Sequence, residues 1–472
     1  MRIYLETLGC QMNRLDSELV TCLLAAAGHE MTGELRQADV VLYNTCSVRQ
    51  LAEEKVHSRL GHLGAMMRRG KIGAPIVGVL GCMAQRTGHA LRKRHPHVSI
   101  VCAPGQLGAL VGMIAQAAEG RPAVALDPER TDVPARPADG PGDWDPRACD
   151  ALDLARDPSL APSPGQAYVR VMRGCDNFCS YCIVPFVRGP EVSRRPDRIL
   201  DEVKRLAEAG RRTITLLGQT VNRYRWQAGG TTVRFSDLLE RLSGVLGVRR
   251  LRFVTSHPLD FGDDILDVMA SSPTICPYIH CPAQSGSDAV LAAMNRGYTR
   301  AQYDDLVDRA RALVPDVVLA SDFIVGFPGE TQADHHASAE LIRRSAFRNS
   351  FIFKYSPRPG SSAAETLEDN VPDDVKKRRN NELLAVQADV SLEHYTGYVG
   401  RTLEVLVEGP SRRVDKQAHA PTPQATQLSA RTRGDHIVVF DGPTDLAGQY
   451  VDVEITSATA VTLLGRRAEG VP

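Results

Sequence analysis

The chain has 472 residues, enough for two or three domains, and its 43% hydrophobic and 24% charged residues are typical of a soluble globular protein. Its 56 Lys and Arg are balanced by 56 Asp and Glu, so net charge does not indicate a nucleic-acid partner, and any such surface must be a local patch. No apolar run approaches the roughly 18 residues that a membrane-spanning helix needs, which excludes an integral membrane protein with spanning helices.

The N-terminal apolar run contains Glu6, which favours a strand over a signal peptide. We therefore expect a cytoplasmic protein. In that reducing compartment eleven cysteines indicate metal or redox chemistry rather than a disulfide framework.

Residues 1–120 alternate predicted strands and helices, which favours a parallel, doubly wound sheet. The expected strands are 3–8, 40–44, 75–80 and 98–102, and the clearest helices are 16–27 and 51–67. Residues 121–165 contain nine of the 29 prolines and are predicted to be a linker.

Residues 166–395 repeat a strand–helix pattern six times, which predicts a partial or full α/β barrel with its site at the carboxyl ends of the strands. The expected strands are 167–172, 213–217, 250–255, 278–281, 317–325 and 350–355, with helices at 196–209 and 333–344. A long helix is predicted over 372–395, with Pro372 at its first position. Residues 396–472 contain short predicted strands at 402–407, 437–440 and 451–455, which indicate a small β-barrel.

The most specific motif is Cys175-Asp-Asn-Phe-Cys179-Ser-Tyr-Cys182, which follows a predicted barrel strand. A [4Fe–4S] cluster normally takes four thiolates, so three would leave one iron open to a small molecule. The alternatives are a structural zinc loop or three buried cysteines. A zinc loop needs a fourth ligand at short spacing, and the nearest histidine, His257, is remote.

A second set consists of Cys10, Cys46 and Cys82, which are separated by 36 and 36 residues and each follow a predicted strand. In a doubly wound sheet the carboxyl ends of the strands converge on one crevice, where three thiolates could hold a second cluster. The alternative is that they are buried cysteines acting as small hydrophobes. Cys102 also ends a strand and could lie near that crevice. The remaining cysteines lack a pattern and are expected to be core residues or bystanders: Cys22, Cys149, Cys276 and Cys281.

The loop RGCDNFCSYCIVPFVRG (173–189) resembles the signature of the radical S-adenosylmethionine superfamily. The resemblance implies that the open iron binds S-adenosylmethionine, and that one electron cleaves it to a 5′-deoxyadenosyl radical. It also implies that the backbone of Tyr181 contacts the adenine.

A wider resemblance runs over nearly the whole chain. GCQMN (9–13), NTCSVR (44–49) and GCMAQR (81–86) resemble the cysteine motifs of methylthiotransferases, and the tail resembles a TRAM domain, an RNA-binding module. The later barrel motifs fit as well: LLGQTVNRY (216–224), CPAQSGS (281–287), IVGFPGET (324–331) and YSPRPGS (355–361). GCQMN and VRGPEVSRRP (187–196) are most similar to the tRNA-2-methylthio-N6-dimethylallyladenosine synthases.

That resemblance implies insertion of a methylthio group at C2 of an isopentenylated adenosine beside the anticodon. The cluster on Cys10, Cys46 and Cys82 would carry the transferred sulfur. The implied cofactors are two [4Fe–4S] clusters and S-adenosylmethionine. The implied partners are a tRNA anticodon stem-loop, an electron donor such as flavodoxin or ferredoxin, and a sulfur donor. We expect a monomer.

Weaker signals concern binding residues. Two glutamines at the ends of predicted barrel strands are candidates for cofactor binding, Gln219 and Gln284, and the alternative is that they are solvated loop residues. Two glycines after a predicted strand are further candidates, Gly326 and Gly329, and the alternative is a tight turn without a ligand. Basic residues are candidates for RNA binding, although a solvated surface is the commoner role of such charges: Arg188, Arg194, Arg195, Arg431 and Arg433. The sequence departs from the family pattern at Ala430, at Cys102, at Cys281 and in an inserted stretch, 414–426.

Three other functions fit parts of the pattern. A sister methylthiotransferase would act on threonylcarbamoyl-adenosine in tRNA or on a ribosomal protein. A two-cluster electron carrier would need no substrate cavity, so a long barrel with glycine-rich strand ends disfavours it. A metal-stabilised RNA-binding module would show no cleavage of S-adenosylmethionine.

Overall fold

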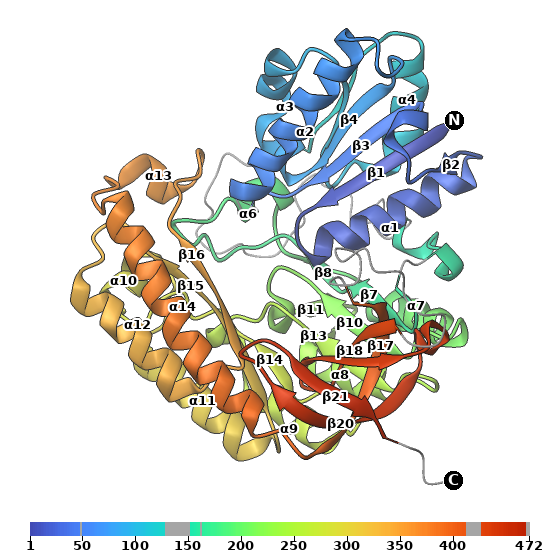
Figure 1. The fold of residues 1–472 in the computed structure, drawn as a ribbon. Helices are drawn as coiled ribbons and strands as arrows, with labels where there is room; N and C mark the ends of the chain where they lie inside the picture. Colours follow the sequence, from blue (N-terminus) through green and yellow to red (C-terminus); the bar gives the residue numbers. More distant parts are fainter. Residues whose placement is uncertain (48–49, 128–151, 161–162, 412–425, 469–472) are drawn as a thin grey trace.

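The computed structural model describes residues 1–47, 50–127, 152–160, 163–411 and 426–468. Three units follow one another along the chain: an N-terminal sheet with helices, a central set of parallel strands with outer helices, and a small C-terminal barrel (Figure 1). No helix in the described part of the chain is long and apolar enough to cross a membrane.

The N-terminal unit is a six-stranded parallel sheet in the order β2-β1-β3-β4-β5-β6, as its alternating pattern predicted. Its strands are β1 (Arg2–Leu8), β2 (Glu30–Met31), β3 (Val40–Thr45), β4 (Ile76–Gly81), β5 (Val98–Cys102) and β6 (Ala123–Ala125). Helices α1 (Gln11–Ala26) and α4 (Leu110–Ala118) pack on one face, and α2 (Gln50–Arg68) and α3 (Cys82–Arg94) on the other. The strand order changes direction between β1 and β3, so the crevice of such a sheet lies at their carboxyl ends.

The sheet extends further than its predicted boundary at residue 120. Strand β6 pairs with β5 through Ile100 and Ala123, inside the stretch expected to be a linker. The three apolar residues 123–125 are enough to form an edge strand. They were not predicted as a strand because the neighbouring prolines indicate a linker. Residues 128–151, which include Cys149, lie outside the described residues.

The central unit contains the six predicted parallel strands in two three-stranded sheets. One sheet holds β7 (Gln166–Arg170), β10 (Thr213–Leu217) and β13 (Arg250–Phe253), and the other holds β14 (Tyr278–His280), β15 (Val318–Val325) and β16 (Asn349–Lys354). A parallel bridge between Leu251 and Ile275 joins the two sheets, so the strands form a partial barrel in chain order.

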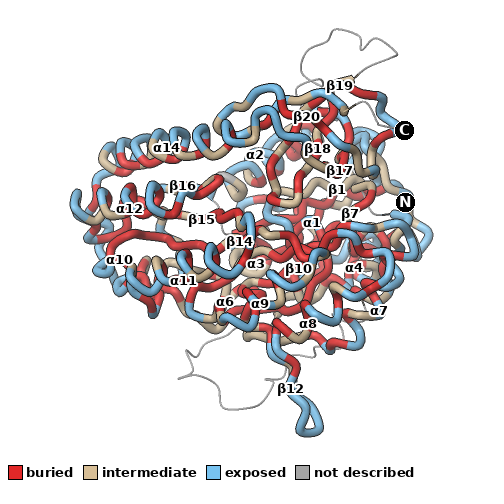
Figure 2. The backbone as a smooth tube through the Cα atoms, turned by 90° about the horizontal axis from the view of Figure 1, so that it is seen from below, coloured by how far each residue is buried: buried red, intermediate tan, exposed pale blue. Residues whose placement is uncertain are grey.

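Helices cover the outside of this partial barrel and bury one continuous core with it (Figure 1). They are α7 (Pro196–Glu208), α8 (Phe235–Ser243), α9 (Asp263–Ser271), α11 (Arg300–Leu313), α12 (Gln332–Ser345) and α14 (Asp373–Thr396). The long helix α14 begins one residue later than predicted, because Pro372 has an extended backbone with ψ 147° and precedes the first turn. The hairpin of β11 (Arg225–Ala228) and β12 (Thr231–Arg234) projects from the body, with an exposed tip (Figure 2).

The C-terminal unit is a closed barrel in the order β17-β18-β19-β21-β20. Its strands are β17 (Thr402–Pro410), β18 (Thr426–Arg431), β19 (Ile437–Gly442), β20 (Tyr450–Ala458) and β21 (Leu463–Arg467). The sequence predicted three of these five. The predicted insertion 414–426 lies outside the described residues except for Thr426, which begins β18.

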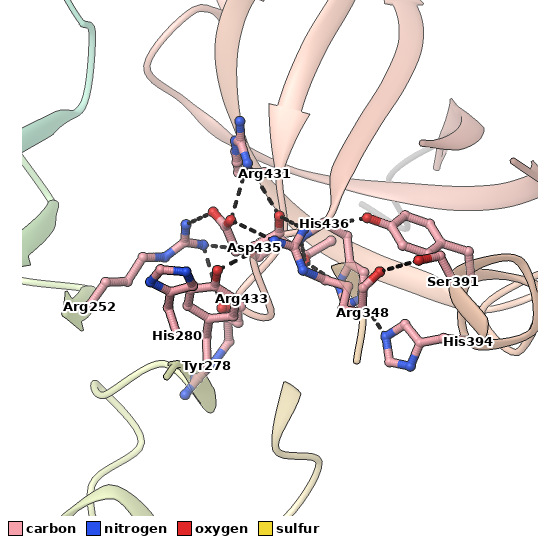
Figure 3. A network of polar contacts seen from close by, with 12 residues as sticks. Arg252, Tyr278, His280, Arg348, Ser391, His394, Arg431, Arg433, Asp435 and His436 are labelled. Atoms are coloured by element: carbon pink, nitrogen blue, oxygen red, sulfur yellow. Dashed lines mark hydrogen bonds and ion pairs between the residues drawn. The ribbon is translucent and has the colours of Figure 1, made fainter. Parts of the chain in front are cut away.

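The small barrel docks on the central unit through arginines (Figure 3). The Asp435 carboxylate pairs with Arg252 at 2.7 Å, with Arg348 at 3.1 Å and with Arg431 at 3.3 Å. Arg252 and Arg348 belong to the central unit and are almost fully buried, so Asp435 of the small barrel supplies a negative charge beside two guanidinium groups that would be costly to bury without a partner.

Candidate functional site

The segment that carries Cys175, Cys179 and Cys182 is closed at its base by a two-stranded ladder. Strand β8 (Met172–Arg173) leads into the loop and pairs with β9 (Val192–Ser193), which leads out of it. Gly174 has φ 74°, and a Cβ there would lie 1.8 Å from the Pro190 carbonyl oxygen. Only glycine permits this approach, which fixes where the cysteine loop begins.

The three sulfur atoms of this loop face different partners. The Arg296 guanidinium donates to the Cys179 sulfur at 3.3 Å, and the Val184 amide donates to the Cys182 sulfur at 3.4 Å. The Thr220 hydroxyl lies 3.7 Å from the Cys175 sulfur. Burial raises the pKa of the Cys175 thiol to about 12, as expected for cysteines that need a metal to stabilise the thiolate.

The far side of the loop rests on the segment after β14. The Ser180 amide donates to the Met294 carbonyl at 3.0 Å, and the Ser180 hydroxyl donates to the Ala293 carbonyl at 2.8 Å. Tyr181 packs against an apolar cluster that includes Met294 and Phe327. The loop is therefore anchored at both sides of its three cysteines.

Cys10, Cys46 and Cys82 each follow a strand, β1, β3 and β4, at the crevice end of the N-terminal sheet. Glycines bring these strand ends together. A Cβ on Gly9 would lie 2.9 Å from the Cys46 Cβ, and a Cβ on Gly81 would lie 2.4 Å from the Thr45 carbonyl oxygen. The residues before Cys10 and Cys82 are thus both in contact with the turn that holds Cys46.

Two buried asparagines hold the three turns in place. Asn13 Nδ2 donates to Asn44 Oδ1 and to the Thr45 carbonyl, both at 3.0 Å, and the Cys10 amide donates to Asn13 Oδ1 at 3.3 Å. Asn44 Nδ2 donates in turn to the Asn13 carbonyl and to the Ser17 hydroxyl, both at 2.9 Å. Every polar atom of the two amides therefore serves to position a strand end.

Asn44→Ala should lower the free energy of unfolding of the N-terminal unit by about 1–3 kcal/mol, because it leaves the buried amide of Asn13 with one donor unpaired. Urea unfolding followed by circular dichroism measures the change. The matched control is Gln116→Ala, which removes an exposed hydrogen bond to Pro122 in the same unit and should cost less than about 0.5 kcal/mol. Equal effects of the two substitutions would contradict the positioning role of Asn44.

A short helix connects the two cysteine sets. Helix α6 (Val184–Arg188) starts two residues after Cys182, and its Val187 packs with Ile183 against Cys82. At its end the Arg188 guanidinium donates to the Cys82 sulfur at 3.2 Å and to Asp16 at 3.0 Å. The end of the loop 173–189 is therefore in direct contact with the third cysteine of the N-terminal unit.

This contact contradicts part of the predicted RNA surface. Arg188 is buried between Cys82 and Asp16, and Arg194 is buried against Asp153 and Glu202. Neither side chain is accessible to RNA, because α1 and the segment after residue 152 cover the region, which sequence order alone did not reveal. Arg195 is exposed and pairs with Asp197, so its RNA-binding role stays a prediction.

The buried charges around Arg188 form a balanced network at the junction of the two units. Arg170 bridges Asp16 and Asp153, and Arg156 bridges Glu18 and Glu202. Including Arg188 and Arg194, four arginines face four carboxylates with every side chain at most 7% exposed. Such pairing is required because an unpaired charge at this depth would be costly.

The charges also act on the thiols of the N-terminal set. A hydrogen bond with Cys46 lowers the pKa of the Cys10 thiol to about 6 against the opposing effect of burial, and the positive charge of Arg188 adds to this. Burial raises the pKa of the Cys82 thiol, which Arg188 opposes. A guanidinium close to Cys82 and Cys10 favours the anionic state of these thiols that soft metal ions bind.

The residues present fit two iron–sulfur clusters and a polar cofactor. Each set offers three thiols, which suits iron–sulfur chemistry. No three His, Cys, Asp or Glu in the part of the chain described lie close enough to hold a single ion, and a cluster of four irons spaces its ligands more widely than one ion does. Gln219 Oε1, at the end of β10, is buried without a hydrogen-bond partner among the described residues, which fits a ligand-binding role.

The other predicted cofactor residues are placed as follows. Gln284, four residues after β14, has φ 70°, and left-handed backbone at a residue other than glycine clusters at functional sites. Gly326 has φ 70°, and a Cβ there would lie 2.3 Å from Lys376 Cγ, so the turn and its packing explain this glycine. Gly329, with φ 81°, donates its amide to Asn370. Contacts of all three with S-adenosylmethionine stay predictions.

The remaining cysteines and tail arginines have other surroundings. Cys102 lies in the apolar core of the sheet, Cys281 in the barrel core, and Cys22 and Cys276 are buried. Arg431 pairs with Glu408 and Asp435, and Arg433 donates to the Ile275 carbonyl, so both belong to the docking region of the small barrel.

Sequence analysis missed the residues that support the sulfurs: Asn13, Asn44, Asp16 and Arg296. Asn13 and Asn44 lie within the cysteine motifs GCQMN and NTCSVR, close to Cys10 and Cys46. Their positions in these motifs could have identified them as residues that support the thiols. Arg296 contacts the Cys179 sulfur across 117 residues of sequence, and cysteine spacing cannot predict such a contact.

Known families match all three units. The Radical SAM superfamily matches residues 169–342, the Uncharacterized protein family UPF0004 matches residues 2–103, and the TRAM domain matches residues 397–467. Among solved structures, the radical S-adenosylmethionine methyltransferase TsrM from Kitasatospora setae resembles this chain with a TM-score of 0.52 at 15% identity. The match covers 77% of this chain and 74% of that one, which shows a shared fold.

Curated relatives match almost end to end. The tRNA-2-methylthio-N(6)-dimethylallyladenosine synthase of Rhodopirellula baltica is 46% identical over 98% of this chain and 95% of its own length. The enzyme of the same name from Geobacter metallireducens is 41% identical over 99% of this chain and 98% of its own length. The predicted fold class and enzyme class are thereby confirmed, and the chain belongs to the tRNA-2-methylthio-N(6)-dimethylallyladenosine synthase family of radical SAM transferases.

Proposed function

We propose that this enzyme adds a methylthio group to C2 of N6-dimethylallyladenosine beside the anticodon of tRNA. The observation that supports the proposal is the contact of Cys82 with Ile183, Val187 and Arg188, because one of the three N-terminal cysteines thereby lies directly beside the loop of Cys175, Cys179 and Cys182. The relatives' names supply the substrate class, and their identity over nearly the whole chain supports carrying it over.

Two [4Fe–4S] clusters and S-adenosylmethionine fit this function. Together they supply the one-electron chemistry that an unactivated aromatic C–H requires, which acid–base groups do not supply. Cys175, Cys179 and Cys182 would hold the cluster that binds S-adenosylmethionine, with Tyr181, Gln219 and Gln284 beside the cofactor. Cys10, Cys46 and Cys82 would hold the cluster that carries the transferred sulfur.

The protein's own residues orient and shield these groups. Asn13 and Asn44 fix the positions of the three strand-end thiols, and Arg188 and Arg296 each donate to one sulfur. The N-terminal unit packs over the partial barrel, since Met12 and Leu15 of α1 are buried with Leu217 of β10. Covering a reactive site in this way excludes water from it.

The remaining partners follow from the same chemistry. An electron donor such as flavodoxin or ferredoxin and a donor of sulfur are required, and the TRAM domain is the expected tRNA-binding module. We propose a cytoplasmic monomer. Family membership favours an enzyme over an electron carrier or a non-catalytic RNA-binding module.

A competition assay tests the substrate. Anticodon stem-loops that carry unmodified, isopentenylated or threonylcarbamoylated adenosine are offered together to the reconstituted enzyme, and the product nucleosides are measured by mass spectrometry. We expect the methylthio group only on the isopentenylated loop. Preferential product from the threonylcarbamoylated loop would reassign the enzyme to the sister activity, and product on a ribosomal protein would remove tRNA as the substrate.

A further inference from the structure

An aromatic pair lies on β16, the edge strand of the partial barrel. Phe351 and Phe353 lie two residues apart on β16, and their rings stack with centroids 6.5 Å apart at 14°. Phe351 is 47% exposed, among the most exposed large apolar side chains described. β16 pairs only with β15 in its sheet, so the aromatic pair lies at the open edge of the partial barrel.

The pair points away from the outer helices. Ile352, between the two rings, is buried in the core shared with Phe323 of β15 and Leu383 of α14. Since successive residues of a strand point to opposite faces, Phe351 and Phe353 lie on the inner face of the sheet. Figure 1 shows α11, α12 and α14 on the outer side of β14, β15 and β16.

The inner face links this pair to the radical loop. Phe353 is the register partner of Ile324 on β15, so both point to the same side. Ile324 packs against the same apolar cluster as Tyr181, which precedes Cys182 in the loop. The aromatic pair thus lies one strand away from the cluster that supports the predicted cofactor loop.

A carboxylate lies next to the pair on the same face. Asp322 is the register partner of Phe351, and its Oδ1 lies 3.2 Å from His280 Nε2. Apolar rings attract an apolar substituent, whereas a neighbouring carboxylate repels an anionic one. The wall therefore suits an uncharged hydrocarbon group attached to a hydrogen-bonding base.

We infer that Phe351 and Phe353 form the wall that receives the dimethylallyl group of the target adenosine, with Asp322 disfavouring the carboxylate of a threonylcarbamoyl group. This inference rests on the proposed function and names the residues that select its substrate. Unmodified adenosine would lack the group that contacts this wall, and a single methylene in an apolar pocket already changes discrimination by about 10–200-fold.

The test compares affinities of reconstituted holoenzyme for anticodon stem-loops with isopentenylated and unmodified adenosine. For the wild type we expect the isopentenylated loop to bind more tightly. In Phe351→Ala/Phe353→Ala the preference should fall by about tenfold or more, while Phe351→Leu/Phe353→Leu should retain most of it because leucine restores apolar area. Leu384→Ala, which trims an exposed apolar side chain on α14, is the matched control and should keep the wild-type preference.

Iron content and circular dichroism of each variant verify that the holoenzyme has folded. If the alanine double variant kept the wild-type ratio of affinities, the inference would be overturned while the proposed function stood. If the wild type itself neither preferred nor modified the isopentenylated loop, the proposed function would fail, and this inference with it.

Discussion

Replacing Cys10, Cys46 and Cys82 together by alanine is expected to lower the iron content from about eight to about four atoms per chain, as loss of one of two [4Fe–4S] clusters requires. Cleavage of S-adenosylmethionine to 5′-deoxyadenosine should persist in this variant, because the radical loop keeps its own anchors at Gly174 and Ser180. Transfer of the methylthio group to RNA should be lost.

The complementary variant replaces Cys175, Cys179 and Cys182. It should also lose about half of the iron, and in addition all cleavage of S-adenosylmethionine, since no open iron would remain. The matched control replaces the buried cysteines Cys22, Cys102 and Cys276 by alanine and should keep the full iron content. Full iron in the Cys10/Cys46/Cys82 variant would show that the second cluster is wrongly placed.

Asp435→Ala should cost about 3–5 kcal/mol of unfolding free energy, because it removes the partner of the buried arginines Arg252 and Arg348. Loss of this carboxylate should also release the small barrel, which limited proteolysis between α14 and β17 would detect. The matched control is Glu454→Gln, which breaks the exposed pair with Arg466 and should cost at most about 1 kcal/mol. Equal effects would contradict the docking role of Asp435.

The same carboxylate predicts a dependence of docking on pH. Burial alone would raise the pKa of Asp435, but Arg431, Arg252 and Arg348 outweigh burial and lower it below its usual value. A folded-state pKa below the unfolded one stabilises the folded protein above about pH 4, the ordinary value for Asp, and this stabilisation is lost as the pH falls below it. Asp435→Ala should therefore show a smaller loss of stability between pH 5 and pH 3 than the wild type, as urea titrations would measure.

The docking also explains how the RNA-binding role of the tail should be tested. Deleting residues from 400 onward would leave Arg250, Arg252 and Arg348 without the carboxylates and carbonyls that they contact. A deletion would thus damage the central unit as well as remove the TRAM domain. Substitutions on the exposed face of the small barrel separate the two effects.

Strand periodicity predicted most of the architecture because the chain alternates apolar strands with amphipathic helices. Strand 98–102 was predicted with the bounds that the structure has, and 213–217 likewise. β6 was not predicted because three residues flanked by prolines carry too little pattern, and β18 was not predicted because it contains only two apolar residues, Leu428 and Ala430.

The cysteine spacings predict two sets of thiols, and the structure places one set on a single loop and the other after the neighbouring strands β1, β3 and β4. That each set holds a cluster stays a prediction. The charges around them could not be predicted in the same way. Arg188 and Arg194 looked like a basic surface because the sequence does not show that Asp16, Asp153 and Glu202 fold back onto them from as far as 172 residues away. Long-range pairing of this kind requires the tertiary structure.

Helix α6 has five residues, with Cys182 just before it and Arg188 at its end. A single inserted residue would turn Arg188 by about 100° around the helix axis and move it by about 1.5 Å along it, away from Cys82 and Asp16. Insertions and deletions in this segment are therefore expected to be selected against. The projecting tip of the β11–β12 hairpin has no such constraint on its length. Likewise, a chimera that exchanges the N-terminal unit between relatives must carry α6 with it for the two units to fit together.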